Sequence, residues 1–314
     1  GRDRAWACQE RRHPHQIVPR RPAVSDCITL FVGGPTTISP MTTRHAWLPA
    51  RGTLLISTDL HGNGEDFRAL RARFLQALQH GPEVHWVVLG DSVHGPDAAA
   101  RAEHPELYDY PDESGAIVLE LLGLRQRYPD QVHYVLGNHD HAHIGGPRTR
   151  KFYDDEAEHL EERLSPPERV ALRALFSTAK LAVLAPCGAL LSHGSPDDTL
   201  RTAADLDAIP LELSRCDAYQ RRVLATFLQS YGQRGEVTAR LLQRLSGPGR
   251  ELTFVVHGHD RDESGWFIEG DNQACPVIFG APRANKRLLC LDLAARYRSV
   301  HELRDGVEIQ RVHG

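Results

Sequence analysis

Apolar and polar residues alternate along the chain in a pattern that predicts strands and helices in succession. The run 64–80 places its apolar residues at helical spacing, and Pro129 closes a second helical run over 114–129. Short apolar runs predict three buried strands, at 53–58, 83–90 and 131–137. This strand–helix rhythm predicts an α/β fold whose right-handed crossovers cover the faces of a sheet.

The second half of the chain alternates charged helical stretches with further strand-like runs. Two helical insertions are expected near 150–180 and 197–250, and residues 179–196 between them have strand character. Three more strand-like runs follow, separated by polar turns, at 251–259, 275–282 and 287–293. We therefore expect residues 46–314 to form a single domain, with the insertions shaping a substrate cleft.

The N-terminal segment differs from the rest. Residues 1–40 carry six arginines against three acidic residues, without helical or strand periodicity, and they lack the continuous apolar core of a secretory signal. The only methionine of the chain is Met41. We expect residues 1–45 to be a disordered or non-native extension, with the natural protein beginning at Met41.

Composition excludes several classes of protein. The chain has 314 residues, 41% of them hydrophobic and 25% charged, with a net charge of −4. These values fit a soluble globular protein without a basic field for nucleic acid, and the apolar runs are too short to span a membrane. The six cysteines form no CxxC pair. We therefore expect a cytoplasmic protein with reduced thiols and neither nucleic acid nor a membrane as partner.

Potential metal ligands follow five of the strand-like runs. The five endings read "STDLHGN" (57–63), "VLGDSVHG" (88–95), "VLGNHD" (135–140), "LLSHGSP" (190–196) and "VVHGHD" (255–260). Any one of them is compatible with a plain turn or a hydrogen-bonded histidine. Ligands of open α/β sheets bind at the carboxyl ends of strands, so five such endings in succession predict a metal site at one edge.

The order of these motifs resembles that of the calcineurin-like metallophosphoesterases: D-x-H, G-D, G-N-H-D/E, H-G and G-H. The match runs from about residue 53 to residue 293. "DLHGN" (59–63) and "VIFGAPRANKRLLCLDL" (277–293) are similar to segments of the phosphoprotein phosphatase branch. The resemblance implies a four-layer α/β/β/α sandwich with helical insertions and two divalent metal ions.

By this resemblance, each expected ligand has a defined place. Asp59 and His61 hold the first metal and Asp91 bridges the two. The second metal is held by Asn138, His193 and His259. An alternative takes His257 and His259 as a pair with one histidine for each metal. Arg261 stands where broader members of the superfamily place another histidine. Such ligands accept manganese, iron or zinc according to supply.

The same resemblance implies roles in catalysis. His139 is expected to be the general acid that protonates the leaving group, with Asp140 or another carboxylate to orient it. A hydroxide bridging the metals would attack phosphorus. Asn138 is expected to contact substrate as well as metal. His141 and His143 are expected to be loop residues or substrate contacts.

One motif departs from the phosphatase branch. "GDSVHG" (90–95) has His94 where that branch has an orienting aspartate, and Gly95 where it has a phosphate-binding arginine. We therefore place His94 near the substrate and expect an arginine from elsewhere to bind phosphate, since a guanidinium suits that anion. The candidates are Arg148, Arg150 and Arg283, of which we select Arg283.

These features predict a metal-dependent hydrolase of phosphate monoesters, acting on phosphoserine or phosphothreonine in proteins or on a small phosphate ester. Two alternatives stay open. The same metals serve phosphodiester or dinucleotide polyphosphate hydrolysis, and a chain without the phosphate-binding arginine is also compatible with a non-catalytic phosphate-binding module.

Overall fold

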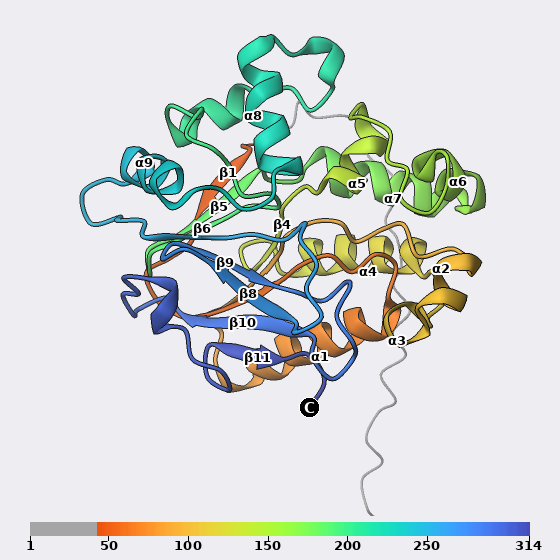
Figure 1. Ribbon diagram of the computed structural model, residues 1–314, viewed down its shortest axis with the longest axis horizontal. Helices are drawn as coiled ribbons and strands as arrows, with labels where there is room; N and C mark the ends of the chain where they lie inside the picture. The colour runs from red at the N-terminus through yellow and green to blue at the C-terminus, as the bar shows by residue number, and fades with distance from the viewer. Residues whose placement is uncertain (1–42) are drawn as a thin grey trace, which may run out of the picture. The chain divides into compact units, whose positions relative to one another are not determined.

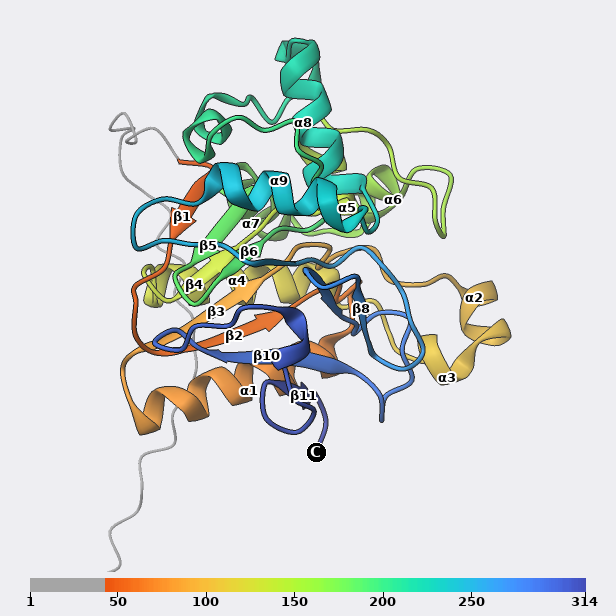
Figure 2. The same ribbon diagram turned by 60° about the vertical axis from the view of Figure 1, so that its left-hand side comes forward.

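The computed structural model describes residues 43–314, and within them the strands form two sheets packed face to face (Figures 1 and 2). The expectation of a disordered or non-native extension over residues 1–45 lies, apart from its last three positions, outside the described residues. The first described strand begins at His45.

The five-stranded sheet contains the strands that the sequence predicts most clearly. Its order is β11-β10-β2-β3-β4. Its members are β2 (Thr53–Ser57), β3 (Val84–Val88), β4 (Val132–Tyr134), β10 (Arg287–Asp292) and β11 (Ile309–Arg311). Strands β2, β3 and β4 run parallel, whereas β10 is antiparallel to β2. The carboxyl ends of β2, β3 and β4 therefore meet at one edge.

The six-stranded sheet has the order β1-β5-β6-β7-β9-β8. Its members are β1 (His45–Trp47), β5 (Ala182–Ala185), β6 (Ala189–Leu191), β7 (Phe254–Val256), β8 (Trp266–Glu269) and β9 (Gln273–Pro276). Strands β6, β7 and β9 run parallel. The strand-like stretch 179–196 thus folds as a hairpin of β5 and β6, and β6 then pairs with β7 in parallel.

Helices cover the outer faces of both sheets. Helices α1 (Gly64–His80) and α4 (Ser114–Arg127) pack on the five-stranded sheet, where the rings of Phe67 and Phe74 lie 6.2 and 5.7 Å from that of Trp86 in β3. Helices α8 (Ala218–Gln229) and α9 (Gly235–Leu245) lie on the side of the six-stranded sheet (Figure 2).

The remaining helices are short or belong to the first insertion. They are α2 (Ala98–Glu103), α3 (Pro105–Tyr108), α5 (Asn138–His141), α6 (Glu156–Arg163), α7 (Pro166–Ser177) and the 3₁₀ helices η1 (Ala142–Ile144), η2 (Ala203–Ala208), η3 (Leu213–Arg215) and η4 (Val300–Glu302). Among the helices of residues 43–314, none combines the length and apolar character needed to cross a lipid bilayer.

A dry core separates the two sheets. Ile56, Val87 and Val135 reach it from the five-stranded sheet, and Leu191 and Val256 reach it from the six-stranded sheet; all five are fully buried. The neighbouring positions of β2 and β3 point outward to the helices, so both faces of each sheet are covered. The predicted four-layer α/β/β/α sandwich is confirmed.

One strand prediction is wrong in extent. The run 275–282 reads as a strand, but β9 ends at Pro276 and Val277 to Ala281 continue as buried irregular chain. Proline has no backbone N–H and the next turn contains Gly280 at φ 82°, a conformation that favours glycine. Burial without strand pairing explains the apolar pattern there.

Candidate metal centre

The predicted ligands lie at the carboxyl ends of strands from both sheets. Asp59 follows β2, Asp91 follows β3, and Asn138 opens α5 directly after β4. From the other sheet, His193 follows β6 and His259 follows β7. A cavity of about 530 Å³ lies at this edge, and its walls include the predicted residues Asp59, His61, Asp91, Asn138, His139 and His259.

The backbone is constrained where the side chains gather. Four of these residues have positive φ angles: Asp59 (44°), His61 (43°), Asp91 (50°) and His259 (70°). Residues other than glycine pay of order 1–3 kcal/mol to adopt this region, and such strain persists only where the surrounding structure imposes it. It turns each side chain sharply from its strand toward the cavity.

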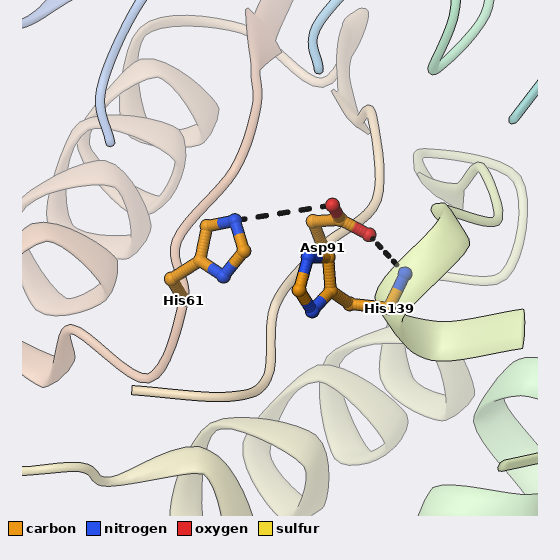
Figure 3. Close-up of side chains that lie close together, drawn as sticks. All are labelled: His61, Asp91 and His139. Atoms are coloured by element: carbon orange, nitrogen blue, oxygen red, sulfur yellow. Dashed lines mark hydrogen bonds and ion pairs between the residues drawn. The ribbon is translucent and has the colours of Figure 1, made fainter. Parts of the chain in front are cut away.

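Asp91 stands between two groups of donors. On one side, its Oδ2 lies 3.8 Å from Nε2 of His61, which is itself 3.9 Å from Oδ1 of Asp59. Figure 3 shows Asp91 facing His61, with its other oxygen accepting the backbone N–H of His139 at 2.9 Å. This first group is completed by the imidazole of His139, which lies close enough to Asp91 and His61 to share an ion with them.

On the other side of Asp91 is the second group. Nε2 of His193 lies 3.3 Å from Oδ2 of Asp91 and 3.0 Å from Oδ1 of Asn138. His259 joins Asp91 and His193 with ligand atoms within 4.8 Å of one another. His257 is not part of this group and lies instead with Asp260 and Cys275. Asp91 is therefore the one carboxylate shared by both groups.

Backbone carbonyl oxygens fix the orientation of two of the imidazoles. Nδ1 of His61 lies 3.2 Å from the carbonyl oxygen of His94, and Nδ1 of His193 lies 2.6 Å from that of Leu89. Each ring donates its Nδ1–H to a carbonyl and presents Nε2 to Asp91. A hydrogen bond from Nδ1 to a backbone carbonyl is a common way in which proteins set the tautomer of a metal-binding histidine.

Burial and charge shift the protonation of the ligands. Burial, with the nearby Lys151, lowers the pKa of His61 well below its ordinary value, so its imidazole is neutral. Burial alone would lower the pKa of His193, but the charge of Asp91 and the contact with it raise that pKa to about 10. Burial raises the pKa of Asp59. A bound cation would replace the proton of His193, since imidazole ligates only when neutral.

The donor set fits divalent cations. Two carboxylates, four imidazoles and an amide oxygen converge, and a shared carboxylate stands between the two groups as a bridge requires. So many buried polar groups would be costly to crowd together without a cation to satisfy them. The residues present therefore agree with a pair of metal ions.

His139 has a carboxylate partner that the sequence did not reveal. Its Nδ1 lies 3.1 Å from Oε2 of Glu156, the fully buried first residue of α6. Burial would raise the pKa of Glu156, but the proximity of His139 lowers it, so the carboxylate is charged. Glu156 belongs to a run of acidic residues and follows no strand. This pattern is typical of a solvent-exposed helix N-terminus, so the sequence does not indicate a catalytic role for Glu156.

Behind His139 lies a chain of histidines. Nδ1 of His94 is 2.9 Å from Nδ1 of His139, and Nε2 of His94 is 2.9 Å from Nε2 of His143. Nδ1 of His143 lies 2.9 Å from Oε1 of Glu161 in α6. His94 is thus buried behind the general-acid candidate and does not line the cavity.

Asp140 has a different environment from the one expected of it. Its carboxylate accepts the backbone N–H groups of Asp91 and Gly137, both at 2.9 Å, and that of Ser92 at 3.3 Å. It also accepts the hydroxyl of Tyr134 at 2.8 Å. These contacts join the ends of β3 and β4, and the carboxylate that lies beside the ring of His139 is that of Glu156.

Basic residues line one wall of the cavity. Arg150, Lys151 and Arg261 stand there, together with Thr149, Tyr231 and Phe279. The ammonium of Lys151 lies 3.9 Å from the centre of the Phe279 ring. Desolvation of its ammonium, together with the charge of Arg261, lowers the pKa of Lys151 to about 8.

Two of the arginines considered for phosphate lie elsewhere. Arg283 is exposed, forms an ion pair with Glu65 at 2.6 Å, and lines a separate cavity. Arg148 pairs with Asp155 at 3.0 Å. Lys151 received no assignment from the sequence, because a lysine in an irregular stretch between insertions carries no recognisable pattern.

The fold and this site define the class of the protein. The family model of the calcineurin-like phosphoesterases matches residues 52–261, more than half of the chain. The chain belongs to this family, whose members are metal-dependent hydrolases of phosphate esters.

Solved structures are similar to this chain at low sequence identity. A protein serine/threonine phosphatase from Saccharomyces cerevisiae has 17% identity and a TM-score of 0.53, over 80% of this chain and 76% of that one. A cold-active protein-tyrosine phosphatase from a psychrophilic Shewanella species has 12% identity and a TM-score of 0.48, over 81% and 78%. No curated protein sequence matches the chain.

Proposed function

We propose that the protein hydrolyses phosphate monoesters at a pair of divalent metal ions, with phosphoserine or phosphothreonine in proteins as the substrate class. The observation that carries this proposal is the position of Asp91, shared by two donor groups beside a histidine that a buried carboxylate supports. The similarity of fold to the yeast serine/threonine phosphatase supports the choice of substrate class.

The metal ligands are assigned from the two groups. Asp59, His61 and Asp91 hold one ion. The other ion is held by Asp91, Asn138, His193 and His259. Manganese, iron and zinc all suit these donors. When bound, two such ions supply Lewis-acid stabilisation of the phosphoryl oxygens and an activated water.

The protein's own residues would move one proton. His139 donates a proton to the oxygen of the leaving alcohol as the ester bond breaks, and the charged carboxylate of Glu156, 3.1 Å from Nδ1, helps to orient the ring. Such a carboxylate also stabilises the protonated imidazole. The histidines behind it, His94 and His143, keep the ring from turning, so we assign orientation of His139 to Glu156 in place of Asp140.

The basic wall selects the phosphate. Lys151, Arg150 and Arg261 line the cavity that holds the ligands, and a monoester dianion carries more charge for them to neutralise than a diester does. We therefore assign to Lys151 the contact with substrate phosphate that the sequence had led us to place at Arg283. This wall also favours monoester over diester hydrolysis.

The experiment is a comparison of two substrates by metal-stripped protein with manganese added back. p-Nitrophenyl phosphate is a monoester and bis-p-nitrophenyl phosphate is a diester of the same leaving group. We expect metal-dependent hydrolysis of the monoester, and its loss in Asp91→Asn. Faster hydrolysis of the diester would replace the proposal with phosphodiesterase activity, and protein that binds no metal would refute it. Phosphopeptides then test the substrate class.

A further inference from the structure

A second set of ligand-type side chains lies next to the loop that carries His259. His257 directly follows β7, and the pairing of Val256 with Ala274 places it beside Cys275 of β9. A ring nitrogen of His257, a carboxylate oxygen of Asp260 and the Sγ of Cys275 all lie within 4.8 Å of one another. None of the three belongs to the two groups around Asp91.

Polar atoms of this cluster lack partners. Nε2 of His257 and Oδ2 of Asp260 are buried without a hydrogen bond, although Oδ2 lies 3.5 Å from Nδ1 of the same histidine. His257 is fully buried, and its Nδ1 lies 3.0 Å from the carbonyl oxygen of Gly258, which accepts its proton. The lone pair of Nε2 is therefore free. Buried polar atoms left unsatisfied cost about 1–3 kcal/mol each, so their presence points to a ligand that satisfies them.

The sulfur has only weak contacts. Cys275 is fully buried, and the nearest acceptors of its thiol are the carbonyl oxygens of Gly258 at 3.9 Å and Pro276 at 3.8 Å. A thiol in such surroundings gains little from hydrogen bonding. Besides the apolar Val277, Ala281 and Phe267, its neighbours include an imidazole and a carboxylate, which an ordinary apolar cysteine site lacks.

We propose that His257, Asp260 and Cys275 form a third cation site, separate from the metal pair, that binds a thiophilic divalent ion of the zinc type. Nitrogen, oxygen and thiolate donors together suit zinc, and three protein ligands leave a fourth position for water. Binding converts the Cys275 thiol to a thiolate and releases its proton to solvent. The ligands around Asp91 contain no sulfur, so the two kinds of site differ in the metals that they prefer.

The ion would connect three segments of the fold. It would join the end of β7, the middle of β9 and the loop residue Asp260. Between them lies His259, whose backbone N–H donates to Oδ2 of Asp59 at 3.0 Å. A cation here would therefore fix the loop that carries a proposed ligand of the metal pair.

Cadmium tests the site directly, because a cadmium–thiolate bond gives an ultraviolet charge-transfer band. The full-length protein, stripped of metal, is titrated with Cd²⁺. We expect a saturable band that is lost in Cys275→Ser. The matched control is Cys187→Ser, which changes an equally buried free cysteine outside the cluster and should keep the band. A band of equal intensity in the wild type and Cys275→Ser would overturn the proposal.

A second variant guards against a folding defect in Cys275→Ser. Asp260→Asn keeps the thiol and changes a residue at the edge of the cluster, where the side chain is 16% exposed. We expect its affinity for Cd²⁺, followed by the same band, to fall by at least about tenfold. Unchanged affinity would contradict the site. Asp91→Asn should retain the band, so failure of the metal pair and failure of the third site give different results.

Discussion

At the scale of single residues, the contact between Glu156 and His139 has a consequence for the choice of substrate. Proton donation matters for an alcohol that leaves as a strong base and matters little for p-nitrophenolate. We expect Glu156→Gln to lower kcat for phenyl phosphate by about 100-fold or more and for p-nitrophenyl phosphate much less. Steady-state kinetics with a series of aryl phosphates measures this difference.

The control for that series is Glu158→Gln, which changes an acidic residue of the same helix whose side chain does not contact the cavity. It should leave both substrates unaffected. An equal loss of both substrates in Glu156→Gln would mean that Glu156 only supports the fold, and His139 would then need another partner.

Two alanine substitutions distinguish whether Lys151 or Arg283 binds the substrate phosphate. A charged hydrogen bond to phosphate contributes about 1.5–3 kcal/mol, so Lys151→Ala should lower kcat/KM by about 10- to 100-fold, chiefly through KM. Arg283→Ala removes an exposed ion pair with Glu65, and surface pairs of this kind contribute little. A larger loss at Arg283 would restore the assignment made from the sequence.

The residues that sequence reasoning could place are those attached to strand ends. Asp59, Asp91 and His193 follow apolar runs directly, so topology alone brings them together. Glu156 and Lys151 reach the cavity from an insertion, and where an insertion folds back depends on packing that no local pattern encodes. The same holds for His94, which the motif suggests as a substrate contact but which is buried against His139 and does not line the cavity.

At the scale of elements, Asp140 links two strands. Its carboxylate accepts hydrogen bonds from three backbone N–H groups at the ends of β3 and β4. It therefore connects the loops that carry Asp91 and Asn138. Asp140→Asn replaces an acceptor with a donor there, and we expect the free energy of unfolding to fall by about 2–4 kcal/mol. Urea denaturation measures this change.

The exposed Asp154 provides a matched control, since Asp154→Asn should leave stability unchanged within about 0.5 kcal/mol. If Asp140 oriented His139 directly, Asp140→Asn would instead show the selective loss of poor leaving groups expected for Glu156→Gln. A stable Asp140→Asn protein with that kinetic signature would favour the assignment made from the sequence.

Strands β3 and β4 also carry a pair of histidines that responds to acid. The rings of His85 and His133 lie 5.9 Å apart, and burial, with the charge of His85, lowers the pKa of His133 from 6.5 to about 4. The folded state therefore binds fewer protons than the unfolded state between these values. Stability is full above pH 6.5 and falls as the pH drops toward 4.

Because His133 is only partly buried, we expect a discounted effect of about 1 kcal/mol between pH 7 and pH 5. Urea unfolding at the two pH values measures it. His133→Gln cannot titrate, so its stability should depend less on pH over this interval. The same slope in both proteins would assign the acid sensitivity to other groups.

The elements themselves were predictable to different degrees. The helix expected over 64–80 is observed over those residues, because its apolar face and the Asn63 cap, which accepts from the N–H of Asp66 at 3.1 Å, agree with each other. Strands β1, β8 and β11 were missed. Each has only three or four residues and lies at the edge of its sheet, so its apolar pattern is too brief to indicate a strand.

At the scale of the whole molecule, the candidate metal centre lies where the two sheets meet. Asp59, Asp91 and Asn138 come from the five-stranded sheet, whereas His193 and His259 come from the six-stranded sheet. Elsewhere the sheets are held together by a non-directional apolar core. An ion bound by ligands of both sheets would therefore connect them directly, and its binding free energy would oppose unfolding.

Removal of metal should consequently lower stability as well as activity. A ligand that binds only the folded state at 100 times its Kd adds about 2.7 kcal/mol to the free energy of unfolding. We expect Mn²⁺ to raise the melting temperature of chelator-treated protein by several degrees in a concentration-dependent way, measured by calorimetry. Asp91→Asn removes the carboxylate shared by both groups and should lose most of this increase, whereas Cys187→Ser should keep it. Asp91 is the one side chain among the described residues that belongs to both donor groups. An equal increase in melting temperature in Asp91→Asn would therefore show that manganese acts outside the candidate centre.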